Sequence, residues 1–102
     1  MKQYTDERLS FDVEGLDLTT ITNLHMTFSQ PFGSSFTSTD VDVIDATHGS
    51  VLVTQEQTAL LKPGEVKVQL NFFDETGLRD ATDEGVLPVE SNLLRRILDN
   101  GN

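Results

Sequence analysis

The chain has 102 residues, an apolar content of 36% and no cysteine. These values fit one domain with a modest core, and they exclude disulfides, thiolate metal sites and cysteine nucleophiles. A formal net charge of −10 repels phosphate groups, so we expect no nucleic-acid partner and no attraction to an anionic membrane.

The first residues, 1–7, form a polar N-terminal segment, MKQYTDE. The segment contains no apolar signal region, and no apolar run in the chain approaches the ~20 residues of a membrane-spanning helix. We therefore expect a cytosolic protein, or one that is assembled in the cytosol into something larger.

Alternating apolar and polar residues predict strands at 8–14, 21–29 and 36–45. Such alternation buries one face of a strand and leaves the other in water. In the third of these strands the pattern places Val41 and Val43 inward. Proline and glycine at 30–35 predict the turn that precedes it.

The middle of the chain predicts a hairpin connection, a strand and a short helical segment. Gly49 suits a left-handed position at the end of the connection, and residues 50–54 form the strand. Good helix formers at 55–61 predict one or two turns with Leu60 and Leu61 in the core, because the segment is too short for an independent helix.

The clearest strand covers residues 65–73, in which every second residue is apolar. Gly77 predicts a tight turn into a weaker strand at 78–82. A short extended segment at 86–89 contains Pro88, which favours an edge position because proline donates no ladder hydrogen bond. In the strand predicted at 65–73, the inward-facing residues are Val66, Val68, Leu70 and Phe72.

The spacing of apolar residues changes at the C-terminus and predicts a helix over residues 91–99 with Ser91 as its N-cap. Two roles remain open for its apolar stripe: it caps the open end of the sandwich, or it packs on a second subunit or another protein. The possible interface residues are Leu93, Leu94, Ile97 and Leu98.

Short strands separated by turns every ~8–12 residues predict an all-β fold. We expect a single antiparallel β-sandwich domain over residues 1–102, immunoglobulin-like, with six to seven strands and a short C-terminal helix.

No residue pattern in the chain matches a known catalytic, cofactor-binding or metal-binding motif. His25 and His48 are far apart and belong to no zinc motif. Acidic groups at 40–45 and 80–84 offer oxygen ligands without the spacing of a calcium loop. We therefore predict no catalytic, cofactor or metal residues and no enzyme activity, with calcium binding kept as an alternative.

A T-x-x-L turn, a glycine, a V-x-V-Q strand, a glycine turn and an L-x-x-G ending follow one another in the second half of the chain. The residues that form them are Thr58, Leu61, Gly64, Val66-Lys67-Val68-Gln69, Gly77 and Leu98-Asp99-Asn100-Gly101. This pattern resembles small virion-associated proteins encoded by phages and prophages of Gram-positive bacteria. Residues 45–53 are similar to an element of the N-terminal β-sandwich module of phage baseplate upper proteins.

The resemblance implies a non-enzymatic phage or prophage structural or assembly protein that acts through protein–protein contacts. It implies a homo-oligomer or contacts with other virion proteins, in the host cytoplasm or in the virion, without a cofactor. The alternative is a carbohydrate- or calcium-binding β-sandwich module. For carbohydrate, Tyr4, Phe32 and Phe36 are the aromatic residues that could stack on a sugar.

Overall fold

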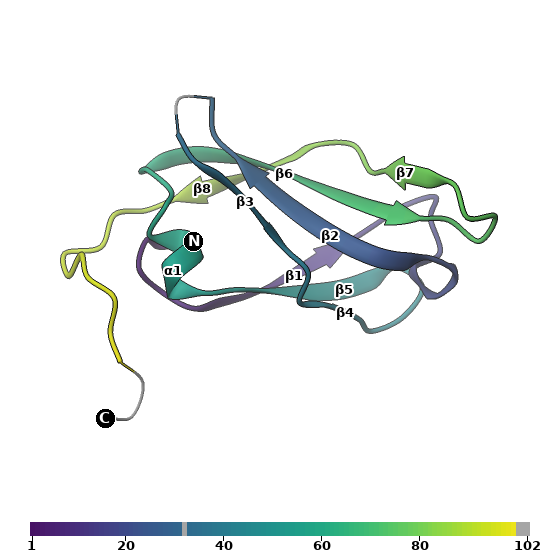
Figure 1. Ribbon diagram of the computed structural model, residues 1–102, viewed down its shortest axis with the longest axis horizontal. Coiled ribbons are helices and arrows are strands. Elements are labelled where there is room, and N and C mark those ends of the chain that lie inside the picture. The colour runs from purple at the N-terminus through teal and green to yellow at the C-terminus, as the bar shows by residue number, and fades with distance from the viewer. Residues whose placement is uncertain (32, 100–102) are drawn as a thin grey trace.

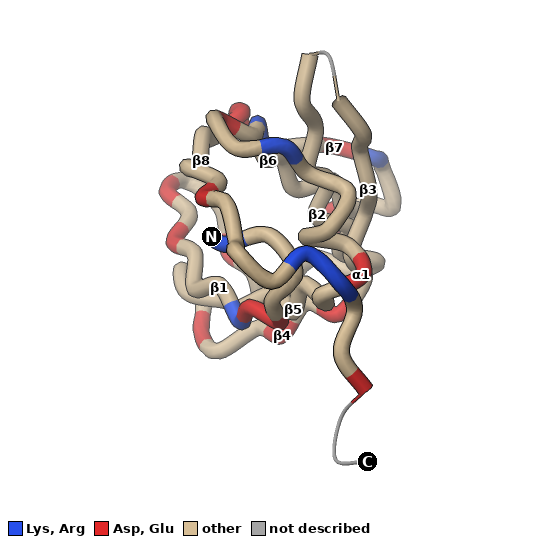
Figure 2. The backbone as a smooth tube through the Cα atoms, turned by 90° about the vertical axis from the view of Figure 1, so that its left-hand side faces the viewer, with Lys and Arg blue, Asp and Glu red and all other residues tan. Residues whose placement is uncertain are grey.

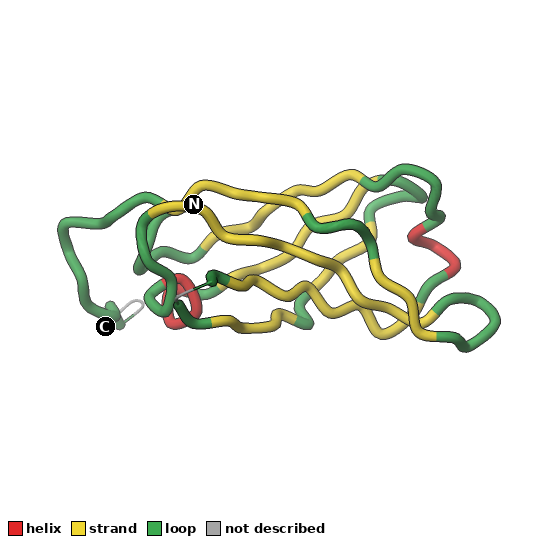
Figure 3. Tube along the Cα trace, turned by 90° about the horizontal axis from the view of Figure 1, so that it is seen from above, coloured by secondary structure: helices red, strands yellow, loops and turns green. Residues whose placement is uncertain are grey.

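The computed structural model describes residues 1–31 and 33–99. Strands account for most of the regular structure, and they run along the length of the molecule (Figure 3). The elements are β1 Glu7–Asp12, η1 Leu18–Thr20, β2 Thr22–Ser29, β3 Ser35–Ser38, β4 Val41–Val43, β5 His48–Val53, α1 Gln55–Thr58, β6 Gly64–Phe73, β7 Arg79–Ala81 and β8 Gly85–Val89.

The strands form two antiparallel sheets (Figure 1). One has the order β1-β5-β4, and the other has the order β3-β2-β6-β7, with β8 also paired to β6. The all-β class is therefore confirmed, although the described residues form eight strands and not the six to seven expected. The immunoglobulin-like arrangement is not confirmed: in immunoglobulin domains the second and third strands belong to different sheets, whereas β2 and β3 form a hairpin within one sheet.

The core consists of apolar side chains contributed by both sheets and by the segments that connect them. Alternation in β2 and β6 turns one face of each strand inward, as the sequence predicts. Pro88 lies in β8, which is an edge strand as expected. The buried apolar residues are Leu18, Ile21, Met26, Phe28, Val51, Val53, Leu61, Val66, Leu70, Phe72 and Val89.

The predicted strand over residues 36–45 is wrong, because the chain changes sheets within it. β3 belongs to the larger sheet and β4 to the smaller one. The buried Ser38 makes the corner: its hydroxyl donates to the Leu52 carbonyl at 2.7 Å and accepts from the Asp40 amide at 3.3 Å. Val41 packs against the core, whereas Val43 is exposed at the end of β4.

The segment after β5 forms one helical turn, α1, where the sequence predicts one or two. Thr54 caps it, and the side chains of Thr54 and Gln57 each bond to the other residue's backbone in a capping box, which satisfies amide groups that a helix start leaves free. Leu61 is buried as predicted. Leu60 is not buried: it is 49% exposed at the end of the turn.

The predicted C-terminal helix is absent: residues 91–99 contain no helix in this structure. Side chains hold the backbone groups that a helix would use. The Asn92 side-chain oxygen accepts from the Leu94 amide at 3.1 Å. The Gln55 side chain accepts from the Leu98 amide at 2.8 Å and donates to the Leu98 carbonyl at 2.7 Å. A segment this short does not hold a helix unless packing supports it.

The polar N-terminal segment 1–7 is fixed to the body of the domain. Lys2 forms an isolated parallel bridge with Glu90. The buried Gln3 side chain donates to the Leu61 carbonyl at 2.6 Å, and the hydroxyl of Thr58 donates to the Thr5 carbonyl at 2.8 Å. These bonds bring the N-terminus alongside β8 and α1.

Gly49 was expected to be left-handed, but it lies inside β5 opposite Phe11. Its role is close packing: a Cβ atom there would lie 2.5 Å from Phe11 Cζ and 3.0 Å from the Asp42 carbonyl oxygen. Gly77, in contrast, has the positive φ of 82° that its turn predicts.

We expect Gly49→Ala to lower the free energy of unfolding by about 1–3 kcal/mol, since extra volume in a packed site forces neighbours to move. Gly85→Ala is the matched control, because the nearest atom to its Cβ is 3.9 Å away. Urea denaturation of both variants measures the difference. Equal midpoints for the two variants would contradict the packing role of Gly49.

Candidate functional site

β7 and β8 behave as one edge strand that is interrupted beside β6. Asn71 pairs with Ala81, and Val68 pairs with Gly85. The two paired residues are therefore three positions apart on β6 but four positions apart on the edge strand. One extra residue on the edge strand is a β-bulge, and it falls at residues 82–84.

Side chains on β6 and at the bulge hold this irregularity in place. The Gln69 side chain donates to the Thr82 carbonyl at 2.9 Å. The Thr82 hydroxyl accepts from the Leu70 amide at 3.2 Å, and the Thr82 amide donates to the Leu70 carbonyl at 2.9 Å. The edge therefore bends without losing its attachment to β6.

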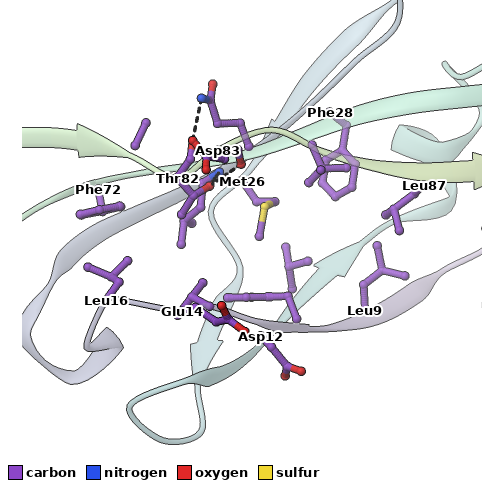
Figure 4. A pocket seen from close by; sticks show the side chains of 18 of the residues that line it. Leu9, Asp12, Glu14, Leu16, Met26, Phe28, Phe72, Thr82, Asp83 and Leu87 are labelled. Atoms are coloured by element: carbon purple, nitrogen blue, oxygen red, sulfur yellow. Dashed lines mark hydrogen bonds between the residues drawn. The ribbon is translucent and has the colours of Figure 1, made fainter.

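A cleft of about 630 Å³ opens between this bent edge and β1. Residues 9–16 form one wall and residues 80–87, apart from Glu84, form the other. Figure 4 shows the two walls facing each other across the gap. The floor is the core itself, including Met26, Phe28 and Val51. Among the described strands, β1 pairs only with β5 and β7 only with β6, so both walls present a free strand edge.

Carboxylates line the rim of the cleft on both sides. Asp12 and Glu14 belong to the β1 wall, and Asp80 and Asp83 belong to the opposite wall. All four residues are exposed, and the described residues that line the cleft include no lysine or arginine. The cleft thus combines an apolar floor with a negatively charged rim, which attracts cationic groups.

The predicted interface residues lie on the C-terminal tail, residues 91–99. Leu93, Leu94, Ile97 and Leu98 have exposed fractions of 101, 45, 46 and 47%. The structure does not gather them into a helical stripe. The tail extends beyond the sheets at the end of the molecule that holds α1 (Figure 1) and carries a basic stretch (Figure 2).

The acidic groups that suggested calcium do not assemble a site. Within residues 1–31 and 33–99, no three His, Asp or Glu side chains gather closely enough to hold a metal ion. Asp45 instead closes the β4–β5 turn: its carboxylate accepts from the Thr47 amide at 2.9 Å and contacts the His48 ring at 2.8 Å. The Thr47 bond and then the His48 bond lower the pKa of Asp45 to about 2.

Two other carboxyls also have local structural partners. Hydrogen bonds from Thr76 and Leu78 lower the pKa of Asp74 in the turn after β6, and bonds from Thr19 lower the pKa of Asp17 at the cap of η1. A general acid at neutral pH needs a raised carboxyl pKa. These three shifts therefore mark turns and caps, whose carboxylates accept backbone N–H groups.

Tyr4 and Phe36, the two described aromatic residues considered for carbohydrate stacking, are both half-buried. The Phe36 ring stacks on the Phe28 ring with centroids 4.9 Å apart and packs against the core. Phe32 lies outside the described residues.

Comparison with protein-family models, with curated proteins and with solved structures finds no match for this chain. Among the described residues, no helix has the length and apolar content needed to cross a bilayer.

Sequence reasoning found the tail but missed the cleft. The walls of the cleft are residues 9–16 and 80–87, which the alternation pattern treats as ordinary strands and a polar loop. The one available signal was that loop, Asp83-Glu84-Gly85, between two weak strands. A bulge depends on pairing register with β6, and register is a property of the assembled sheet.

Proposed function

We propose that this protein is a non-enzymatic assembly module that works through protein–protein contacts made at the cleft between β1 and the β7–β8 edge. The observation that carries the proposal is the apolar lining of this cleft, which combines the exposed Val86 and the half-buried Leu9 and Leu87 with buried core side chains, between two free strand edges. Exposed apolar surface with a polar rim is typical of interaction sites.

The strand edges favour a protein partner over a small apolar ligand. Unpaired backbone groups on an edge strand are available to another polypeptide, and a groove between two edges accepts an extended segment or a helix. The exposed apolar residues of the tail supply a second contact surface on the same molecule. Together they support self-association as a homo-oligomer.

The sequence resemblance to phage and prophage virion proteins supports a role in a virion or its assembly, with other virion proteins as further partners. The T-x-x-L turn of the resemblance corresponds to Thr58 and Leu61, which are both buried here. The V-x-V-Q segment corresponds to part of β6, the central strand of the larger sheet.

Light scattering at several concentrations tests the proposal. We expect the average mass of the native chain to rise with concentration, and Val86→Arg to suppress the rise. Val86 lines the cleft and is 56% exposed. The matched control is Ile44→Arg, at a residue that is 66% exposed in the β4–β5 turn, outside the cleft. A native chain that stays monomeric at every concentration would contradict self-association, and equal effects of the two variants would contradict the cleft.

A further inference from the structure

We propose that the C-terminal tail of one copy, residues 91–99, folds into a helix and binds in the cleft of a second copy. This inference rests on the proposed function, because it names the partner segment that occupies the cleft. Its basis is a match in both apolar surface and charge between two parts of the chain that do not meet within one molecule.

The tail has the pattern of a helix that lies in an acidic groove. Successive helical residues are rotated by about 100°, so Leu93, Leu94, Ile97 and Leu98 would fall in one sector about 140° wide. Arg95 and Arg96 would then lie on opposite flanks, each about 60° beyond an edge of that sector. The sequence therefore places one arginine on each side of an apolar stripe.

The cleft has the complementary arrangement. Its floor is apolar, and each wall carries two carboxylates: Asp12 and Glu14 on the β1 side, Asp80 and Asp83 on the opposite side. A helix with its stripe on the floor directs one arginine to each wall, because a long side chain keeps its charged end at the rim while its stem covers apolar surface. Guanidinium–carboxylate pairs then fix the position of the helix in the cleft.

The occupant comes from a second copy because a helical tail does not reach the carboxylates of its own cleft. Asp80 lies nine residues before Val89, about 30 Å along an extended strand at ~3.3 Å per residue. Arg96 lies five residues after Ser91, which is only about 8 Å along a helix at ~1.5 Å per residue. In the single chain the tail is held at the α1 end, where the Gln55 side chain bonds the Leu98 backbone.

The absence of a helix in the single chain agrees with this assignment. A nine-residue segment needs packing to stay helical, and in the single chain the stripe has little to pack on, since its side chains are exposed by 45% or more. Binding would supply that packing, so helix formation and association are coupled. We expect the helical signal in far-ultraviolet circular dichroism to increase with protein concentration.

Charge reversal on the two partners tests the contact. We expect Arg95→Glu/Arg96→Glu and Asp80→Arg/Asp83→Arg each to weaken self-association by about tenfold or more, because like charges then meet at the rim. An equimolar mixture of the two variants should recover much of the native association, because the native tail of the cleft variant then meets the native cleft of the tail variant. Sedimentation velocity measures the association of the native chain, of each variant and of the mixture. All of the substituted residues are exposed, so the changes need not disturb the core.

The control for altered net charge is Arg8→Glu/Lys62→Glu, which changes the charge as much as the tail variant does but lies outside the tail and the cleft. It should associate like the native chain. Association that survives both reversals would overturn the tail-in-cleft contact and leave the assembly role standing. The contact is also overturned if both variants lose association but the mixture fails to restore it. A native chain that is monomeric throughout would overturn self-association as well.

Discussion

Replacing Phe28 by alanine should lower the free energy of unfolding by about 3–5 kcal/mol. Phe28 is fully buried in β2 at 0% exposure, between the two sheets and stacked on Phe36. Truncation removes the transfer energy of the ring and leaves a cavity that the rigid strands fill poorly. For a domain whose total stability is about 5–15 kcal/mol, this loss is large.

Phe73→Ala is the control for Phe28→Ala, because Phe73 lies in β6 and is 39% exposed. We expect this change to cost less than about 1.5 kcal/mol. Urea denaturation with an unchanged m-value measures both losses. If the two variants unfolded at the same urea concentration, the assignment of Phe28 to the centre of the core would be wrong.

The second large effect is expected at Leu61, which follows α1 and is 1% exposed. Leu61→Ala should cost about 2–5 kcal/mol through lost burial and an unfilled cavity. The same denaturation experiment measures it. This loss would show that the turn after β5 anchors the core as well as connecting two strands.

The neighbouring residue offers a matched control of the same type. Leu60 is 49% exposed, so Leu60→Ala should change stability by less than about 1 kcal/mol. The sequence predicted that both leucines point inward. A loss at Leu60 as large as that at Leu61 would restore that prediction and contradict the structure.

Strand positions were predictable where one face of a strand is buried and the other is exposed to solvent. In β6 the alternation identified four inward residues. Val66, Leu70 and Phe72 are buried, and Val68 is half-buried against the core. The turn glycine Gly77 was predictable for a local reason, since its backbone requires a positive φ.

Features that depend on distant contacts were not predictable. The corner at Ser38 needs the Leu52 carbonyl from another strand, and the requirement for glycine at position 49 comes from the Phe11 ring across the ladder. The helix expected at 91–99 has a valid apolar period, but Gln55 competes for the Leu98 backbone.

The candidate site likewise has one part that the local sequence predicts and one part that depends on distant contacts. The tail was visible in the sequence because its apolar residues are adjacent along the chain. The cleft was invisible because its walls, residues 9–16 and 80–87, are brought together by the stacking of two sheets. Its opening follows from a one-residue register difference along β6, and a single strand's sequence does not contain that information.

Cysteine cross-linking between copies tests the central claim most directly, since the native chain has no cysteine. Ala81→Cys places a thiol in the cleft wall, and Ile97→Cys places one near the centre of the tail's apolar stripe. When the two variants carry tags of different mass and are mixed and oxidised, we expect a disulfide-linked heterodimer to form. The control replaces Ala81→Cys by Thr37→Cys, an exposed position on β3 away from the cleft. A heterodimer yield no higher than that of the control would contradict binding of the tail in the cleft.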